Sequence, residues 1–226
     1  MSNKTQLQTN NEALDGYINR INAAKQVAAT LPESELDLTF YLDGTISGEY
    51  IDTKLTHLRF GAFAGTNLTK ISLPNCVSMT GSRHFTNCPE LEEVNIENVA
   101  SVDGLAYIFN YCPKLKKFSM PKLEYCADTG AAFFGCSEIE RIEFPKLSGT
   151  TLGNYCFRAC PKLKTIIIGG DVLCPLNNEN CFTATSNFTV YVKDELVPTY
   201  QGATNWSKFA SKIKGLSQLP QEEVEE

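Results

Sequence analysis

Apolar side chains recur along this chain with a short period inside a longer one. Five segments have apolar residues at their first and third positions, an alternation that is typical of a strand with one buried face. They span residues 94–96, 118–120, 142–144, 166–168 and 190–192, so each starts 24 residues after the one before. A constant period in this range predicts stacked coils, because each unit buries its apolar side only by packing on its neighbours.

A longer phrase surrounds the first four of these segments. It reads F-x-x-C-[PS]-x-[LI]-x-x-[VFI]-x-[IMF], with phenylalanine and cysteine at a constant offset. The predicted ladder residues are Phe85, Cys88, Phe109, Cys112, Phe133, Cys136, Phe157 and Cys160. Degenerate copies flank them: Phe63 begins one in which Gly65 or Thr66 replaces the cysteine, and Phe182 begins another with Thr185 in that place. Weak copies are expected at the ends, where a repeat meets the core on one side only.

A second apolar stretch follows the strands, usually after a proline such as Pro74, Pro121 or Pro145. Proline cannot donate to a strand ladder, so it ends the strand and turns the chain onto the other side of the coil. We therefore expect residues 33–192 to form an α/β solenoid of about six coils, each of roughly 23–25 residues, with a parallel sheet.

The N-terminal 32 residues follow a different pattern. Leu7, Leu14, Ile21 and Ala28 recur at heptad spacing until Pro32, which predicts an amphipathic helix within residues 1–32. Such a helix either caps the first coil or serves as an oligomerisation or attachment segment, and the pattern leaves both interpretations open.

The C-terminal residues predict a closure for the solenoid. We expect residues 193–219 to form a helical cap with Asn205 as an N-cap. The apolar residues at helical spacing there are Trp206, Phe209, Ile213 and Leu216. Residues 220–226 are acidic, and we expect them to be a disordered tail.

The repeated phrase resembles the BspA-like leucine-rich repeat, F-x-x-C-x-x-L-x-x-I-x-L-P, over about residues 55–192. Residues 191–213 resemble the C-terminal cap of such proteins. The resemblance implies a right-handed leucine-rich repeat coil that serves as a recognition scaffold on the surface of bacteria or in their phages, with no chemistry of its own. The second half of each repeat departs from the common I-G-x-x-A-F and reads G-S-R-H-F or G-A-A-F-F.

Charge and composition exclude several classes of function. A net charge of -6 and a pI near 5.1 argue against a nucleic-acid partner, for which a basic stripe is needed. No run approaches the ~18 apolar residues that would insert in a membrane. Residues 1–11 have no apolar core typical of a signal peptide, so we expect synthesis in the cytoplasm. The protein then either acts where it is made or reaches a surface or virion by another route.

No constellation of residues indicates an enzyme or a cofactor. The two histidines have no nucleophile motif near them, and we expect His57 at the surface and His84 either hydrogen-bonded or solvated. Mixed charges in the repeats are typical of a solvated face. We therefore predict a non-catalytic protein that uses no cofactor and no metal.

The cysteines are better explained by packing than by chemistry. There are nine, and the repeat places four of them in a column with a strand spacing of ~4.8 Å. A column is not a tetrahedron, which disfavours zinc, and we expect buried free thiols that act as small hydrophobes. Two pairs merit a test for oxidation, Cys156 with Cys160 and Cys174 with Cys181.

Side chains that alternate with the buried ones should point outward and form the candidate binding face. It consists of Lys70, Ser72, Glu93, Asn95, Lys117, Ser119, Arg141, Glu143, Thr165, Ile167, Thr189 and Tyr191. The face is polar at first and apolar near Ile167 and Tyr191, with Tyr191 as the expected anchor for a protein or glycan partner. The alternative is a cytosolic structural or regulatory spacer with no ligand on this face.

Overall fold

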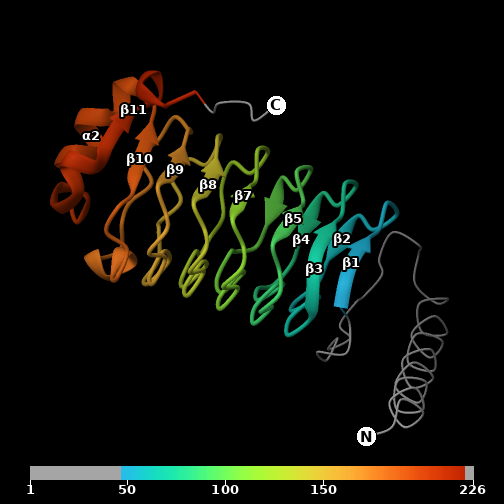
Figure 1. Ribbon diagram of the computed structural model, residues 1–226. Coiled ribbons are helices and arrows are strands. Elements are labelled where there is room, and N and C mark those ends of the chain that lie inside the picture. The colour runs from blue at the N-terminus through green and yellow to red at the C-terminus, as the bar shows by residue number, and fades with distance from the viewer. Residues whose placement is uncertain (1–46, 222–226) are drawn as a thin grey trace, which may run out of the picture.

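The described part of the chain is a stack of coils with parallel strands on two sides (Figure 1). A computed structural model describes residues 47–221. The strands are β1 (Ser47–Ile51), β2 (His57–Leu58), β3 (Asn67–Ser72), β4 (Ser78–Met79), β5 (Glu93–Asn95), β6 (Ser101–Val102), β7 (Lys117–Ser119), β8 (Arg141–Phe144), β9 (Thr165–Ile168), β10 (Thr189–Val192) and β11 (Ile213–Gly215). Short helices are η1 (Glu179–Phe182), η2 (Asp194–Leu196), α2 (Val197–Gly202), η3 (Trp206–Lys212) and η4 (Leu216–Gln218).

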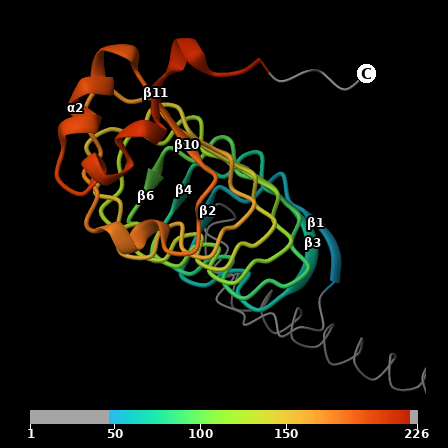
Figure 2. The same cartoon turned by 60° about the vertical axis from the view of Figure 1, so that its left-hand side comes forward.

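One side of the stack carries two runs of strands, ordered β1-β3-β5 and β7-β8-β9-β10-β11. The other side carries β2-β4-β6, which lies across the coil from β1 and β3 in Figure 2. All neighbouring strands pair in parallel, and Phe118, Ile142, Ile166 and Val190 occupy equivalent positions in β7 to β10. The 24-residue period of the sequence is thus the register of the sheet.

The inside of the coil is a continuous apolar core. Phe63, Phe85, Phe109, Phe133 and Phe157 stack with ring centroids 5.1 to 5.8 Å apart, and each is almost fully buried. The stack continues to Phe182, whose ring lies 5.4 Å from that of Phe157. Stacked aromatic rings at these distances add attraction beyond their buried area.

The turn around each phenylalanine hydrogen-bonds to the next turn through its backbone. The amide of Phe109 donates to the carbonyl of Ala132 at 2.8 Å, and that of Phe133 donates to Cys156 at 2.8 Å. In the turns around Phe63 to Phe157, two residues each have left-handed backbone angles, for example Tyr107 and Tyr111 at φ values of 56° and 57°. These turns therefore direct alternate side chains out of the stack while their amides bond between coils.

The C-terminal cap is less helical than the sequence predicted. Trp206 and Phe209 lie in η3, but Ile213 begins strand β11, where it pairs with Val190. Asn205 does not act as a side-chain N-cap; its Nδ2 donates to the carbonyls of Leu176 and Asn177 at 2.8 and 2.9 Å. A strand is favoured at Ile213 because β11 satisfies the backbone edge of β10.

Predictions for the chain ends fall partly beyond the described range. The amphipathic helix of residues 1–32 and residues 222–226 of the acidic tail lie outside the described residues. Within residues 47–221, no helix combines the length and apolar character needed to cross a membrane.

Candidate binding surface

The strand register brings the predicted face residues into two rows. In the first row Lys70 faces Glu93, and Lys117, Arg141, Thr165 and Thr189 follow one another across β7 to β10. In the second row Ser72 faces Asn95, and the rest follow as Ser119, Glu143, Ile167 and Tyr191. The expected juxtaposition of these positions is therefore present.

Charged groups on this face pair with each other. Lys70 Nζ lies 2.9 Å from Glu93 Oε1, and Arg141 Nε donates to Glu143 Oε1. The hydrogen bond from Lys70 to Glu93 raises the pKa of Lys70, and the charge of Glu93 adds to this. Pairs at or near the surface add little to stability, but they leave the face with small local charge.

The apolar end of the predicted face is not exposed. Ile167 and Tyr191 are only 6% and 5% accessible, so the prediction of Tyr191 as an exposed anchor is wrong. Ile167 lies between Glu143 and Tyr191, and Tyr191 lies between Ile167 and Lys214 of β11. The sheet continues past Tyr191 into the cap, and side chains on adjacent strands at ~4.8 Å spacing cover one another.

The cysteine column joins consecutive coils. The thiols of Cys112, Cys136 and Cys160 donate to the carbonyls of Phe85, Phe109 and Phe133 at 2.9, 3.0 and 3.0 Å. At the degenerate last copy, Thr185 Oγ1 donates to Phe157 at 2.6 Å. A hydroxyl therefore replaces the thiol in the same structural role.

None of these thiols is arranged for reaction. All nine cysteines lie in the described part and are buried, with no disulfide among them. Burial raises the pKa of Cys160 to about 12 and that of Cys76 to about 11. The neighbouring Cys112 lowers the pKa of Cys88, but the Cys112 thiol is already donated to the Phe85 carbonyl. A thiol becomes nucleophilic only as the thiolate, which burial disfavours.

The cysteine pairs singled out for oxidation have other neighbours. Burial raises the pKa of Cys156, and a hydrogen bond with the neighbouring Cys181 raises it further. Cys174 packs against the cap, where its amide donates to Tyr200 Oη at 2.9 Å and its carbonyl accepts from Trp206 Nε1 at 2.8 Å. Among the described residues, no group of three or more histidines, cysteines and acids is placed to hold a metal ion.

His84 differs from its prediction. Its side chain is 0% exposed, and neither ring nitrogen has a hydrogen-bond partner among the described residues. Burial lowers the pKa of His84 to about 4, against weaker opposing effects from the backbones of Arg59 and Gly81 and the charge of Asp103. His57 is exposed as expected, with Nδ1 2.8 Å from Thr56 Oγ1.

A second exposed surface, which the sequence interpretation missed, follows the F-x-x-C turns. Tyr107, Tyr111 and Tyr155 are 38%, 53% and 38% accessible there, and the Arg83 guanidinium lies 4.1 Å from the Tyr107 ring centre. The sequence does contain an indication of this surface, because the variable positions of the F-x-x-C turns are rich in tyrosine and arginine.

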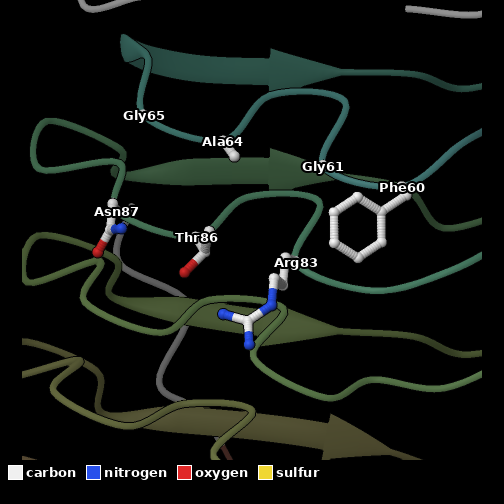
Figure 3. A pocket seen from close by; sticks show the side chains of 7 residues that line it. All are labelled: Phe60, Gly61, Ala64, Gly65, Arg83, Thr86 and Asn87. Atoms are coloured by element: carbon white, nitrogen blue, oxygen red, sulfur yellow. The ribbon is translucent and has the colours of Figure 1, made fainter. Parts of the chain in front are cut away.

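A hollow of about 370 Å³ lies at the N-terminal end of this surface (Figure 3). It is formed where small residues of one turn stand beside larger residues of the next. Its lining residues are Phe60, Gly61, Ala64, Gly65, Arg83, Thr86 and Asn87.

Comparison with known families assigns the repeat. A family model described as the BspA type leucine rich repeat region matches residues 39–130 and 106–201, with six copies. These overlapping ranges cover well over half of the chain. Comparison with curated proteins gave no match.

Proposed function

Because the chain belongs to the BspA-type leucine-rich repeat family, we propose that it is a non-catalytic recognition module whose outward sheet face binds a protein or glycan partner. The observation that carries this proposal is the pair of aligned polar rows on β3, β5, β7, β8, β9 and β10. Polar side chains held at fixed spacing on a rigid sheet are suited to recognition, because binding them costs little conformational entropy.

The proposed contact residues are those of the predicted face without Ile167 and Tyr191. Their mutual salt bridges supply alternating charge, which gives specificity more than affinity. The buried thiols and His84 support a role without chemistry, because they are sealed inside the core.

A swapped charge pair tests the face. Arg141→Glu with Glu143→Arg keeps an ion pair but reverses the pattern seen by a partner. We expect immobilised protein to capture a bacterial or host surface protein or glycan, and the swap to weaken capture by about tenfold or more. The matched control is Glu138→Lys with Lys162→Glu, which swaps a pair 2.6 Å apart outside the face rows. Equal capture by both variants would reject the face as the binding site.

The competing function is a spacer that only holds its two ends apart. The self-paired charges of the sheet face favour it, because they need no partner. If the protein is a spacer, both the Arg141 and Glu143 swap and the control swap leave its biological activity unchanged. If it is a recognition module, only the control swap does.

We further propose display on a bacterial surface or a phage particle, with residues 1–32 as the attachment or oligomerisation segment. The family membership and the heptad pattern support this location. Antibody labelling of intact cells and purified particles tests it, and absence of label from both would overturn it. Light scattering of the chain with and without residues 1–32 tests oligomerisation. If this segment oligomerises the protein, the full chain has a mass above that of one chain, and the shortened chain has the mass of a monomer.

A further inference from the structure

The second exposed surface carries an inference that does not depend on binding at the sheet face. We call it the arginine–aromatic strip, and it follows the F-x-x-C turns over three coil steps. Its members are Arg83, Tyr107, Tyr111, Phe134, Tyr155 and Arg158. Arg83 and the three tyrosines are exposed, and Phe134 and Arg158 are half-buried. Aromatic residues and arginine are enriched in protein interfaces.

Both arginines of the strip lie over aromatic rings. The Arg83 guanidinium lies 4.1 Å from the centre of the Tyr107 ring. The Arg158 guanidinium lies 5.3 and 5.0 Å from the rings of Phe134 and Tyr155, and Phe134 in turn contacts Tyr111 at 5.1 Å. A guanidinium held over a ring by a cation–π contact is not ion-paired, so its N–H groups are available for a carboxylate.

These arginines also differ from the lysines of the repeats in their partners. Lys114, Lys162 and Lys164 each pair with a glutamate one coil earlier, at 2.5, 2.6 and 2.8 Å. Arg83 and Arg158 form no ion pair with any residue in the range 47–221. Their positive charge is therefore left for a group outside this part of the chain.

The turns that form the strip contain no acidic residue. Segments 59–66, 81–88, 105–112, 129–136 and 153–160 include three arginines and neither aspartate nor glutamate. Asp103 and Asp128 lie in adjoining loops, where they accept the backbone amides of Gly81 and Gly130 at 2.8 Å each. On a chain of net charge -6, this is a basic strip, which complements an acidic ligand.

The hollow beside Arg83 gives one end of the strip depth. Gly61, Ala64 and Gly65 form one wall, and Arg83 and Asn87 stand on the neighbouring turn (Figure 3). A carboxylate side chain entering here meets the Arg83 guanidinium. The backbone amides of these turns bond between coils, so recognition must come from side chains and not from strand addition.

We propose that the strip binds an acidic, extended segment of a protein partner, with one carboxylate on Arg83 and another on Arg158. The turns that carry the two arginines are three coils apart, about 14 Å along the stack at ~4.8 Å per coil. In an extended peptide, residues i and i+4 point to the same side and lie about 13.5 Å apart. The matching ligand therefore carries two acids separated by three residues, with an apolar residue at i+2 that points to the same side and lies on the tyrosine rings.

Fluorescence anisotropy with the full chain tests this spacing. The probe is a labelled peptide containing E-T-V-T-E, and the comparison peptide contains E-T-V-E-T, whose acids are one residue closer and point to opposite sides. We expect the first peptide to bind at least about fivefold more tightly, and its binding to weaken as salt rises. Equal affinity of the two peptides would overturn the proposed spacing.

Variants identify the arginines as the site. Arg83→Ala and Arg158→Ala are each expected to weaken the first peptide about tenfold, and Arg83→Lys less, because lysine keeps the charge but loses the fork. Lys114→Ala, an exposed paired lysine, is the matched control and should bind as the wild type does. Circular dichroism confirms folding of each variant.

Two further outcomes separate this proposal from its alternatives. The Arg141 and Glu143 swap should leave peptide binding unchanged, which distinguishes the strip from the sheet face. Tighter binding of an oligogalacturonate than of the peptide, lost in Arg83→Glu with Arg158→Glu, would replace the peptide by an acidic glycan and overturn the proposed partner. Unchanged peptide binding in that double variant would reject the strip altogether.

Discussion

At the scale of single residues, burial controls the chemistry of this protein. His84 has no hydrogen-bond partner among the described residues and an apolar neighbour in Phe85, with ring centres 6.3 Å apart. The charged form of a histidine is strongly disfavoured in such a place. His84 is therefore a neutral core residue that the fold tolerates only while it remains uncharged.

The low pKa of His84 predicts a loss of stability in mild acid. Its folded pKa of about 4 lies below its ordinary value of 6.5, so its contribution is complete above pH 6.5 and is lost as the pH falls towards 4. We expect the free energy of unfolding to fall by roughly 2 kcal/mol more in the wild type than in His84→Leu between pH 7 and 5. Urea titrations at both values measure this, with exposed His57→Gln as control. Parallel pH curves for the wild type and His84→Leu would contradict it.

Burial of the cysteines predicts thiols that react only after unfolding. The thiols of the column are buried and donate to backbone carbonyls, and burial raises the pKa of Cys112, Cys136 and Cys160. We expect a thiol reagent at pH 8 to modify the native protein slowly. After denaturation in the absence of reductant, the same reagent should modify all nine cysteines. Fewer than nine reactive thiols in the denatured chain would indicate a disulfide.

At the scale of the elements, the F-x-x-C turns share one backbone conformation although their residues differ from coil to coil. Gly135 and Ala159 occupy equivalent left-handed positions in consecutive turns, with φ values of 78° and 57°. A side chain at such an angle costs about 1–2 kcal/mol. The turn therefore tolerates alanine or tyrosine at some cost, because the bonds between coils hold its backbone in place.

Opposite substitutions at these two positions should have opposite effects. A Cβ added at Gly135 would lie 2.9 Å from Cδ1 of Tyr111, so we expect Gly135→Ala to lower the free energy of unfolding by about 1–3 kcal/mol. Ala159→Gly relieves the strain of a left-handed alanine, and we expect it to raise the free energy of unfolding by at most about 1 kcal/mol. Denaturant unfolding measures both, and a stabilising Gly135→Ala would refute the argument.

At the scale of the whole molecule, the solenoid has an end that must be closed. Strand β11 pairs with β10, and Trp206, fully buried, packs on Phe182 and Tyr200 with ring centres 5.9 and 5.5 Å away. An open strand edge is a template for association with other chains. We therefore expect the cap to limit association with other chains as well as to stabilise the fold.

Removal of the cap anchor should produce association. Trp206→Ala deletes a large buried side chain and its hydrogen bond to the Cys174 carbonyl, and we expect a loss of about 3–5 kcal/mol. Light scattering should then show larger species whose fraction rises with protein concentration. Lys208→Ala, on the same element but exposed, is the control. A Trp206→Ala protein that stays as disperse as this control would contradict the proposed role of the cap.

The sequence alone determined the repeat, its register and its buried side. Phe85, Cys112 and Ile142 were identified as core because their burial depends on a local pattern that every coil repeats. Even the replacement of cysteine by Thr185 was visible. The family assignment rests on the same repeated residues.

Tertiary structure decided which of the remaining side chains face solvent. Tyr191 belongs to an outward position but is covered because β11 extends the sheet beside it. Arg83 and Tyr107, 24 residues apart, stack only because adjacent turns place them together. Burial within a coil is encoded locally, whereas exposure depends on neighbours from other coils and the cap, which a periodic pattern does not contain.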